Sequence, residues 1–334
     1  MAFPDSLDGE LFYLFVVGPG VGETVLLRLP PDQWVVVDSL KIDGRPAAEA
    51  VIERYGGDVV GIVLTHPHRD HYSGISDLIQ MYPSSMVGCV HPKQGTSGPT
   101  VPADPVTLLK AGAKRTYDLI WDTWNKNDSQ KWMTFRNAVK PLAGATFTPL
   151  HPVNPLGASD WNAASPNDMS SAMLVEWNDL RLLLGADVTN SSWPDIAAIF
   201  PDLADHHVMK VPHHGSKEAI HGSFGNGSSD RVWVVTPYAN SRLPRADKDD
   251  GMSSILNCVS QFELTSLPFL HNRQNEAPCI TTRAELANDT SPTRTGSITQ
   301  LSQEQRAERM VCLAFEKSAR LVSRSFGTGT VCIK

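Results

Sequence analysis

Three apolar segments of the sequence each end in side chains that can bind a metal ion, and this pattern constrains the fold more than any other feature. The segments read DVVGIVLT, LRLLLG and HHVMKVP. The candidate ligands that follow them are His66, His68, Asp70, His71, Asp187, His213 and His214. A bare carboxylate such as Asp187 is costly to bury at the end of an apolar strand, and a bound cation would offset that cost. The sequence therefore predicts a metal centre assembled from the ends of three strands.

The spacing within HPHRDH sorts its four ligands into two pairs. In an extended loop, side chains two residues apart point the same way, so His66 and His68 can hold one ion. Asp70 and His71 come after a bend, where the chain enters the next helix, so they can face a second ion. Imidazole and carboxylate ligands suit Zn²⁺ first, with Mn²⁺ or Fe as alternatives. We therefore expect two divalent ions, with Asp187 bridging them.

The stretch HHGS at residues 213–216 offers two adjacent histidines. If the strand geometry persists, His213 and His214 point to opposite sides, so only one of them is a ligand. The other would orient the site or touch the substrate. Exposed polar turns and helix caps are the alternatives without metal. The recurrence of candidate ligands in three matching contexts argues against them.

Length and charge exclude some other classes of protein. The 334 residues, with 41% hydrophobic content, fit one large domain or two small ones, and we predict a single domain over residues 1–334. The net charge of −7 argues against charge-driven binding to long nucleic acids. Five scattered cysteines without a CxxC pair predict reduced thiols and a cytoplasmic location. Acidic residues precede the apolar run at 11–17, which favours a core strand over a secretory signal. No uncharged stretch is long enough for a membrane span.

The order of segments predicts an α/β chain with two less regular parts. Strand-like runs open the chain, and the glycine turn GPGVG at residues 18–22 separates the first two. Because that turn lacks the GxGxxG spacing and precedes a strand, it does not predict a dinucleotide site. Residues 93–150, rich in tryptophan and polar side chains, predict a helical insertion. Residues 275–334 predict a C-terminal extension or a segment that closes the sheet as a hairpin or helix.

Taken in order, HPHRDH, LLLGAD and VPHHG resemble the ligand motifs of the metallo-β-lactamase-fold superfamily. A nearer likeness is to the hydrolase domain of bacterial DNA-uptake channel proteins and its free-standing relatives, because VVGPGVGETVLLRLPPDQWVVVDS and KVPHHGS are similar to their motifs. The resemblance covers roughly residues 10–90 and 160–245. It implies a four-layer αββα sandwich with an inserted helical cap. It also makes His214 the better ligand and His213 the better neighbouring group.

One position departs from the pattern of the lactamases. They carry a histidine upstream of the second aspartate, and in this sequence that slot falls in SPNDMSS, on Asp168. Asp168 is therefore the expected additional ligand. His151, in LHPVNP, is the alternative.

The resemblance implies a hydrolase that uses a hydroxide bridging two metal ions. The nearer likeness favours a phosphodiesterase acting on a small or single-stranded nucleic acid or a nucleotide. Asp70 would also orient the nucleophile, and His213 would protonate the leaving group. The residues expected to bind phosphate oxygens or stack a base are Tyr72, Asn167, Ser170, Ser216 and Lys217.

Two other functions remain open from the sequence. The same centre can hydrolyse a carbon-centred bond, such as that of a lactone, amide, thioester or peptide. The chain can also be a metal-holding interaction module that binds a partner protein through the insertion or the C-terminal segment.

Overall fold

The computed structural model describes residues 3–91, 109–136, 138–152, 166–225, 230–247, 251–267, 279–288 and 308–334. The side chains of Pro166, Asp168 and Cys279 lie outside this description. Within the described stretches, no helix has both the length and the apolar character needed to cross a bilayer.

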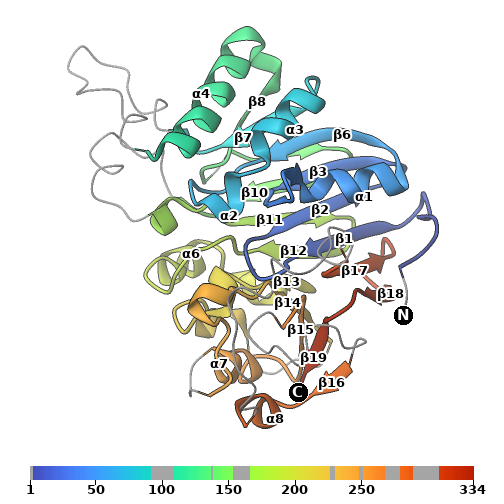
Figure 1. Cartoon of the computed structure of the whole chain (residues 1–334), viewed down its shortest axis with the longest axis vertical. Coiled ribbons are helices and arrows are strands. Elements are labelled where there is room, and N and C mark those ends of the chain that lie inside the picture. Colours follow the sequence, from blue (N-terminus) through green and yellow to red (C-terminus); the bar gives the residue numbers. More distant parts are fainter. Residues whose placement is uncertain are drawn as a thin grey trace.

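The first of two large sheets contains eight strands in the order β18-β17-β1-β2-β3-β6-β7-β8 (Figure 1). In chain order they are β1 (Phe12–Val17), β2 (Thr24–Leu29), β3 (Gln33–Val37), β6 (Asp58–Val63), β7 (Met86–Cys89), β8 (Lys131–Met133), β17 (Met310–Phe315) and β18 (Leu321–Phe326). The strands from β18 to β3 are antiparallel, whereas β3, β6, β7 and β8 run parallel. The carboxyl ends of β3 and β6 therefore lie side by side.

The second sheet contains nine strands in the order β16-β19-β15-β14-β13-β12-β11-β10-β9. In chain order they are β9 (Lys140–Leu142), β10 (Ala145–Pro149), β11 (Met173–Trp177), β12 (Leu180–Leu184), β13 (Val208–Lys210), β14 (Val232–Val235), β15 (Phe262–Leu264), β16 (Cys279–Thr281) and β19 (Val331–Ile333). Strands β12 to β15 run parallel, so their carboxyl ends also share one edge. A separate small ribbon pairs β4 (Lys41–Ile42) with β5 (Arg45–Pro46).

The two sheets pack face to face because strands such as β1 are apolar on both faces. Along β1, alternate residues belong to two different cores. Phe12 and Leu14 lie in the core between the sheets, together with Met173 and Leu182 of the second sheet. Phe15 lies in the core under the helices. The continuous run FYLFVV is therefore buried throughout, as a strand between two layers must be.

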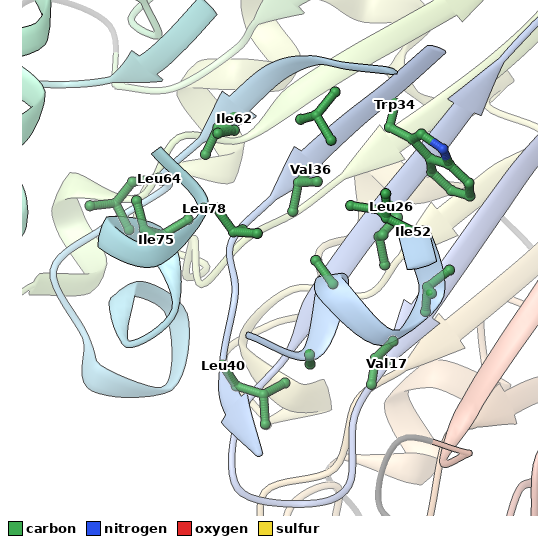
Figure 2. Close-up of a cluster of buried hydrophobic side chains, with 14 of the residues drawn as sticks. Val17, Leu26, Trp34, Val36, Leu40, Ile52, Ile62, Leu64, Ile75 and Leu78 are labelled. Atoms are coloured by element: carbon green, nitrogen blue, oxygen red, sulfur yellow. The ribbon is translucent and has the colours of Figure 1, made fainter. Parts of the chain in front are cut away.

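Helices cover the outer face of each sheet, which gives four layers. The α-helices are α1 (Ala47–Tyr55), α2 (Arg69–Tyr72), α3 (Ile75–Met81), α4 (Ala111–Lys126), α6 (Trp193–Ile199), α7 (Met252–Leu256) and α8 (Arg283–Ala287). Figure 2 shows Ile52 of α1 and Leu78 of α3 beside Val36 of the first sheet. Trp193 of α6 and Met252 of α7 lie in the core of the second sheet's outer face. The expected αββα sandwich is confirmed.

The segment 93–150 differs from the helical insertion that its sequence predicts. Residues 111–126 do form α4, but β8 joins the first sheet and β9 and β10 join the second. Trp132 of β8 packs edge-on against Phe147 of β10, with ring centroids 5.2 Å apart, in the core between the sheets. The prediction is wrong for residues 131–149, because these short strands show little alternation amid lysines and prolines. Residues 93–108 and 137 lie outside the described residues.

The C-terminal segment closes both sheets within its described residues. β17 and β18 form a hairpin that pairs with β1, and β19 and β16 extend the second sheet beyond β15. The described residues of 275–334 thus complete the sandwich, and the remaining residues, 275–278 and 289–307, lie outside the described part of the chain.

Candidate metal centre

The candidate ligands lie at the carboxyl ends of strands from both sheets. His66 and His68 follow β6, and Asp70 and His71 lie in α2. Asp187 follows β12 and the two adjacent histidines follow β13, which is its parallel neighbour. Two hydrogen bonds join these last two loops, from Gly185 N to Lys210 O at 3.1 Å and from His213 N to Ala186 O at 2.9 Å. The fold thus brings the three sequence motifs to one place.

One group of ligand atoms involves the first two histidines. His66 Nε2 lies 3.1 Å from His68 Nδ1 and 3.5 Å from Asp187 Oδ2. All three side chains offer atoms close enough together to hold one ion. Burial, followed by the neighbouring His66, lowers the pKa of His68 to about 4. The neutral imidazole, which is the form that binds a metal, is therefore favoured at neutral pH.

A second group surrounds the carboxylate of Asp70. Its Oδ2 lies 3.6 Å from His71 Nε2 and 3.3 Å from His214 Nε2. Asp187 Oδ2 lies 3.6 Å from His71 Nε2 and 4.0 Å from His214 Nε2. The same oxygen of Asp187 therefore faces both groups, which is the geometry that a bridging carboxylate requires.

Two orphaned atoms at this point fit a metal ion. His71 Nε2 and Asp187 Oδ1 are buried and have no hydrogen-bond partner within the described residues. Buried polar atoms are normally paired, and their pairing here would be supplied by a cation. Burial disfavours a charged His71, yet Asp187, Asp38, Asp70 and Glu23 together raise its pKa well above its usual value. This excess of negative charge would likewise be neutralised by divalent cations.

Asp38, which the sequence analysis missed, orients His71. Its Oδ2 accepts from His71 Nδ1 at 2.7 Å and from the Thr65 hydroxyl at 2.6 Å, while its Oδ1 accepts from Thr65 N at 2.8 Å. The proton on Nδ1 leaves Nε2 of His71 free for a metal. Asp38 follows the apolar strand β3, beside β6, so the signal that found Asp187 was also present here.

We expect Asp38→Asn to weaken metal binding by about 10- to 100-fold. The amide can donate to Nδ1 of His71, which moves the ring proton onto the metal-facing Nε2. Calorimetric titration with Zn²⁺ measures the effect, and Asp32→Asn, at an exposed position, serves as the matched control. Equal affinities for the two variants would contradict this role.

The two adjacent histidines are turned to different partners. His214 Nδ1 donates to Thr236 O at 3.0 Å, and the ring stacks on Tyr238 with centroids 5.0 Å apart. His213 Nε2 lies 3.1 Å from Asn167 Nδ2, and its Nδ1 lies 3.0 Å from the Ser216 hydroxyl. His214 therefore points its Nε2 into the second ligand group, whereas His213 stands at the wall of the cavity. Burial, more than any neighbouring charge, lowers the pKa of His213.

The expected additional ligand lies only partly within the described structure. The backbone of Asp168 belongs to a short 3-10 helix, Pro166–Met169, but its side chain is outside the description, so its role stays a prediction. The backbone N–H of Ser171 donates to Thr65 O at 3.0 Å, which places this segment beside the first ligand group. His151 is buried, and its Nδ1 donates to Ser170 O at 2.7 Å.

A cavity of about 270 Å³ opens over the ligand groups. It is lined by His68, Arg69, Asp70, Lys110, Asp187, His213, His214, Tyr238, Ser241 and Leu243. A second cavity of about 260 Å³ shares two of these residues and is otherwise lined by Ser216, Lys217, Glu218, Arg245 and Gly251. The shared wall consists of His213 and Leu243. The two cavities therefore meet beside the candidate metal ligands.

Some of the predicted substrate-binding residues lie at the two cavities, and others lie in the core. Ser216 and Lys217 line the second cavity, and Asn167 contacts its shared wall through His213. Tyr72 instead packs against the first core, beside Gly112 of α4, and Ser170 is fully buried. Neither belongs to the described lining of the two cavities. The basic residues at the first cavity were missed because single surface cations carry no motif.

A comparison with known protein families matches the part of the chain that contains the first ligand motif, HPHRDH. Residues 17–89 match the family model described as the metallo-beta-lactamase superfamily. That segment runs from the end of β1 through the cluster to β7 and includes the first four candidate ligands. The search of curated proteins returned no match.

The chain is similar to several solved structures at low identity. CmlA, a diiron beta-hydroxylase from Streptomyces venezuelae, has a TM-score of 0.36 and 14% identity, over 67% of this chain and 36% of its own. Zn²⁺-bound PqqB from Methylobacterium extorquens has a TM-score of 0.35 and 13% identity, over 59% of this chain and 71% of its own.

A possible metal-dependent hydrolase from Veillonella parvula has a TM-score of 0.34 and 14% identity, over 69% of this chain and 78% of its own. The chain thus spans little more than a third of the CmlA structure. At these scores the three structures say nothing about the substrate. Residues 17–89, which contain the first four candidate ligands, are thus similar to the metallo-beta-lactamase superfamily, and the two-sheet sandwich is consistent with the fold of that superfamily.

Proposed function

We propose that this chain is a metal-dependent hydrolase that cleaves a phosphodiester bond in a small or single-stranded nucleic acid or a nucleotide. The observation that carries the proposal is the charge around the two cavities. Arg69 and Lys110 line the cavity over the ligands, and Lys217 and Arg245 line the adjoining one. The ion pairs found within the described residues involve other lysines and arginines.

The gathering of these cations contrasts with the acidic character of the whole chain, whose net charge is −7. Of the side chains lining the second cavity, only Glu218 is acidic. Positive side chains beside a metal centre raise the local concentration of anionic substrates. A neutral ester, lactone or peptide has no charge for them to recognise, so the phosphodiester is favoured over a carbon-centred bond.

Different residues around the two cavities would bind the phosphate and orient the leaving group. Two divalent cations, when bound, would lower the pKa of a coordinated water and stabilise the charge that develops on the phosphoryl group. Arg69 and Lys110 would bind the non-bridging oxygens of the phosphate. His213, at the wall between the cavities, would donate a hydrogen bond to the leaving oxygen. The portion of substrate beyond that oxygen would then occupy the cavity with Lys217 and Arg245.

The decisive experiment compares substrate classes in the presence of Mn²⁺ or Zn²⁺. We expect turnover of bis-p-nitrophenyl phosphate and of short single-stranded oligonucleotides, with little turnover of lactones, thioesters or peptides. Hydrolysis confined to the carbon-centred compounds would refute the proposal and establish the alternative hydrolase. An absence of turnover for every class, in a chain that binds metal, would instead establish the interaction module.

Two charge-reversal variants of α4 and the residue before it test whether the positive side chains bind the substrate. We expect Lys110→Glu to raise KM for an oligonucleotide by about tenfold, since one charge is reversed beside the substrate. Metal content should not change, because no ion pair joins Lys110 to a candidate ligand among the described residues. Lys126→Glu, at the exposed far end of α4, is the control and should leave KM unchanged.

A further inference from the structure

We propose that Glu23, in the glycine turn GPGVGE, is a positioning residue for the second ligand group. It acts with Lys210 from behind His71 and His214. The sequence of this turn indicates nothing more than a link between two strands. In the structure, Gly22 and Glu23 contact residues of the candidate metal centre.

The turn first touches the centre through its backbone. Gly22 has φ +150°, and a Cβ at this position would stand 2.6 Å from the carbonyl oxygen of Asp70. The next residue, Glu23, donates its backbone N–H to that same oxygen at 3.1 Å. Only glycine allows this approach, which fixes the backbone of Asp70 against the turn.

The side chain of Glu23 reaches two of the candidate ligands from their far side. It is 2% exposed. Its Oε1 lies 3.8 Å from His71 Nδ1, and its Oε2 lies 3.6 Å from His214 Nδ1. Oε2 also accepts from the Thr236 hydroxyl at 2.5 Å and forms an ion pair with Lys210, itself 1% exposed. One buried carboxylate thus faces both histidines and the ammonium group of Lys210.

Glu23, His71, Asp187 and His214 offer ligand atoms that lie within 4.8 Å of one another, so Glu23 is close enough to share an ion with them. Its contacts with the two histidines, however, are with their Nδ1 atoms, which places it behind the rings. The Nδ1 atoms that it faces already have partners, since His71 Nδ1 donates to Asp38 at 2.7 Å and His214 Nδ1 to Thr236 O at 3.0 Å. The metal-facing atoms are the Nε2 atoms on the opposite side of each ring. Glu23 therefore acts through the two rings, by holding their orientation and by adding negative charge behind them, which strengthens imidazole as a ligand.

Lys210 explains why the carboxylate can remain charged in this place. A buried carboxylate needs a counter-charge, and a buried lysine left alone is strongly destabilising. Lys210 ends β13, a few residues before His214, and Glu23 immediately precedes β2. The ion pair therefore joins the first sheet to the second directly beneath the second ligand group.

The test is a calorimetric titration of the whole chain with Zn²⁺, which resolves binding to each ligand group and uses no substrate. We expect Glu23→Gln to weaken the second binding step by about 10- to 100-fold and to leave the first unchanged, because His66 and His68 do not contact Glu23. Glu53→Gln, an exposed glutamate on α1, is the matched control. Equal loss in both steps, or no loss, would overturn the proposal.

A second variant separates positioning from charge balance. The double substitution Glu23→Leu with Lys210→Met removes both buried charges and should recover the thermal stability that Glu23→Gln loses. If Glu23 positions the histidines, the double variant still binds the second ion weakly. Recovery of both stability and normal affinity would reduce the pair to a structural role and overturn the proposal. Neither outcome depends on whether the substrate is a phosphodiester.

Discussion

Asp187→Ala is expected to abolish metal-dependent hydrolysis, with a loss on the order of 10³-fold, and to reduce bound metal in both ligand groups. The reason is that one carboxylate oxygen of Asp187 faces both ligand groups. Asp187 Oδ2 lies 3.5 Å from His66 Nε2 and 3.6 Å from His71 Nε2, so it is the atom common to the two groups. Removing any other single candidate ligand would leave one group complete.

Metal content and activity should therefore fall together in this variant. Elemental analysis of the purified protein measures the first, and hydrolysis of bis-p-nitrophenyl phosphate measures the second. Asp179→Ala, an exposed aspartate just before β12, is the matched control and should behave as wild type. Full metal occupancy in the Asp187→Ala protein would show that the carboxylate does not bridge.

Gly185→Ala is expected to separate the two loops that carry the later ligands. A Cβ on Gly185 would overlap the ring of Pro212, with Cδ at 2.8 Å and the proline nitrogen at 2.9 Å. The residue lies two positions before Asp187, and Pro212 lies two before His214. We expect a loss of about 1–3 kcal/mol in the free energy of unfolding, as for overpacked sites. The added methyl should also weaken metal binding.

Paired variants isolate this steric effect. Gly222→Ala is the control, because a Cβ there meets nothing within 4 Å. Pro212→Ala combined with Gly185→Ala removes the ring atoms in the way and should restore part of the lost metal affinity. Thermal denaturation and calorimetric titration measure both quantities. If Gly185→Ala binds metal as wild type does, the close packing of the two loops is not needed for the centre.

The strands and the grouping of ligands were predictable because local pattern determines them. An apolar run such as DVVGIVLT has one stable use, as a strand buried on both faces. A charged or imidazole side chain at the end of such a run needs a polar partner. For this reason the position of Asp187 in the sequence predicts a nearby cation. Ligand roles for single residues remain predictions, and Asp168 has no described side chain with which to compare.

The residues that the sequence did not reveal act across the fold. Asp38 follows β3 and Glu23 precedes β2, yet both reach His71. Asp38 bonds to Thr65, 27 positions away, and Glu23 bonds to Thr236, 213 positions away. Contacts of this kind depend on which strands become neighbours. Likewise, Trp132 was assigned to a helix because its partner Phe147 lies across the gap between two sheets. Sequence periodicity carries information about one element at a time.

The pairing of β1 with β17 has a consequence for synthesis on the ribosome. All six residues of β1, from Phe12 to Val17, pair with residues 310–315, while its other edge pairs with β2. Until residue 315 leaves the exit tunnel, this apolar strand has one edge without its final partner. An open edge of that kind invites pairing with other chains. Residues 310–315 therefore protect a strand that is synthesised long before them.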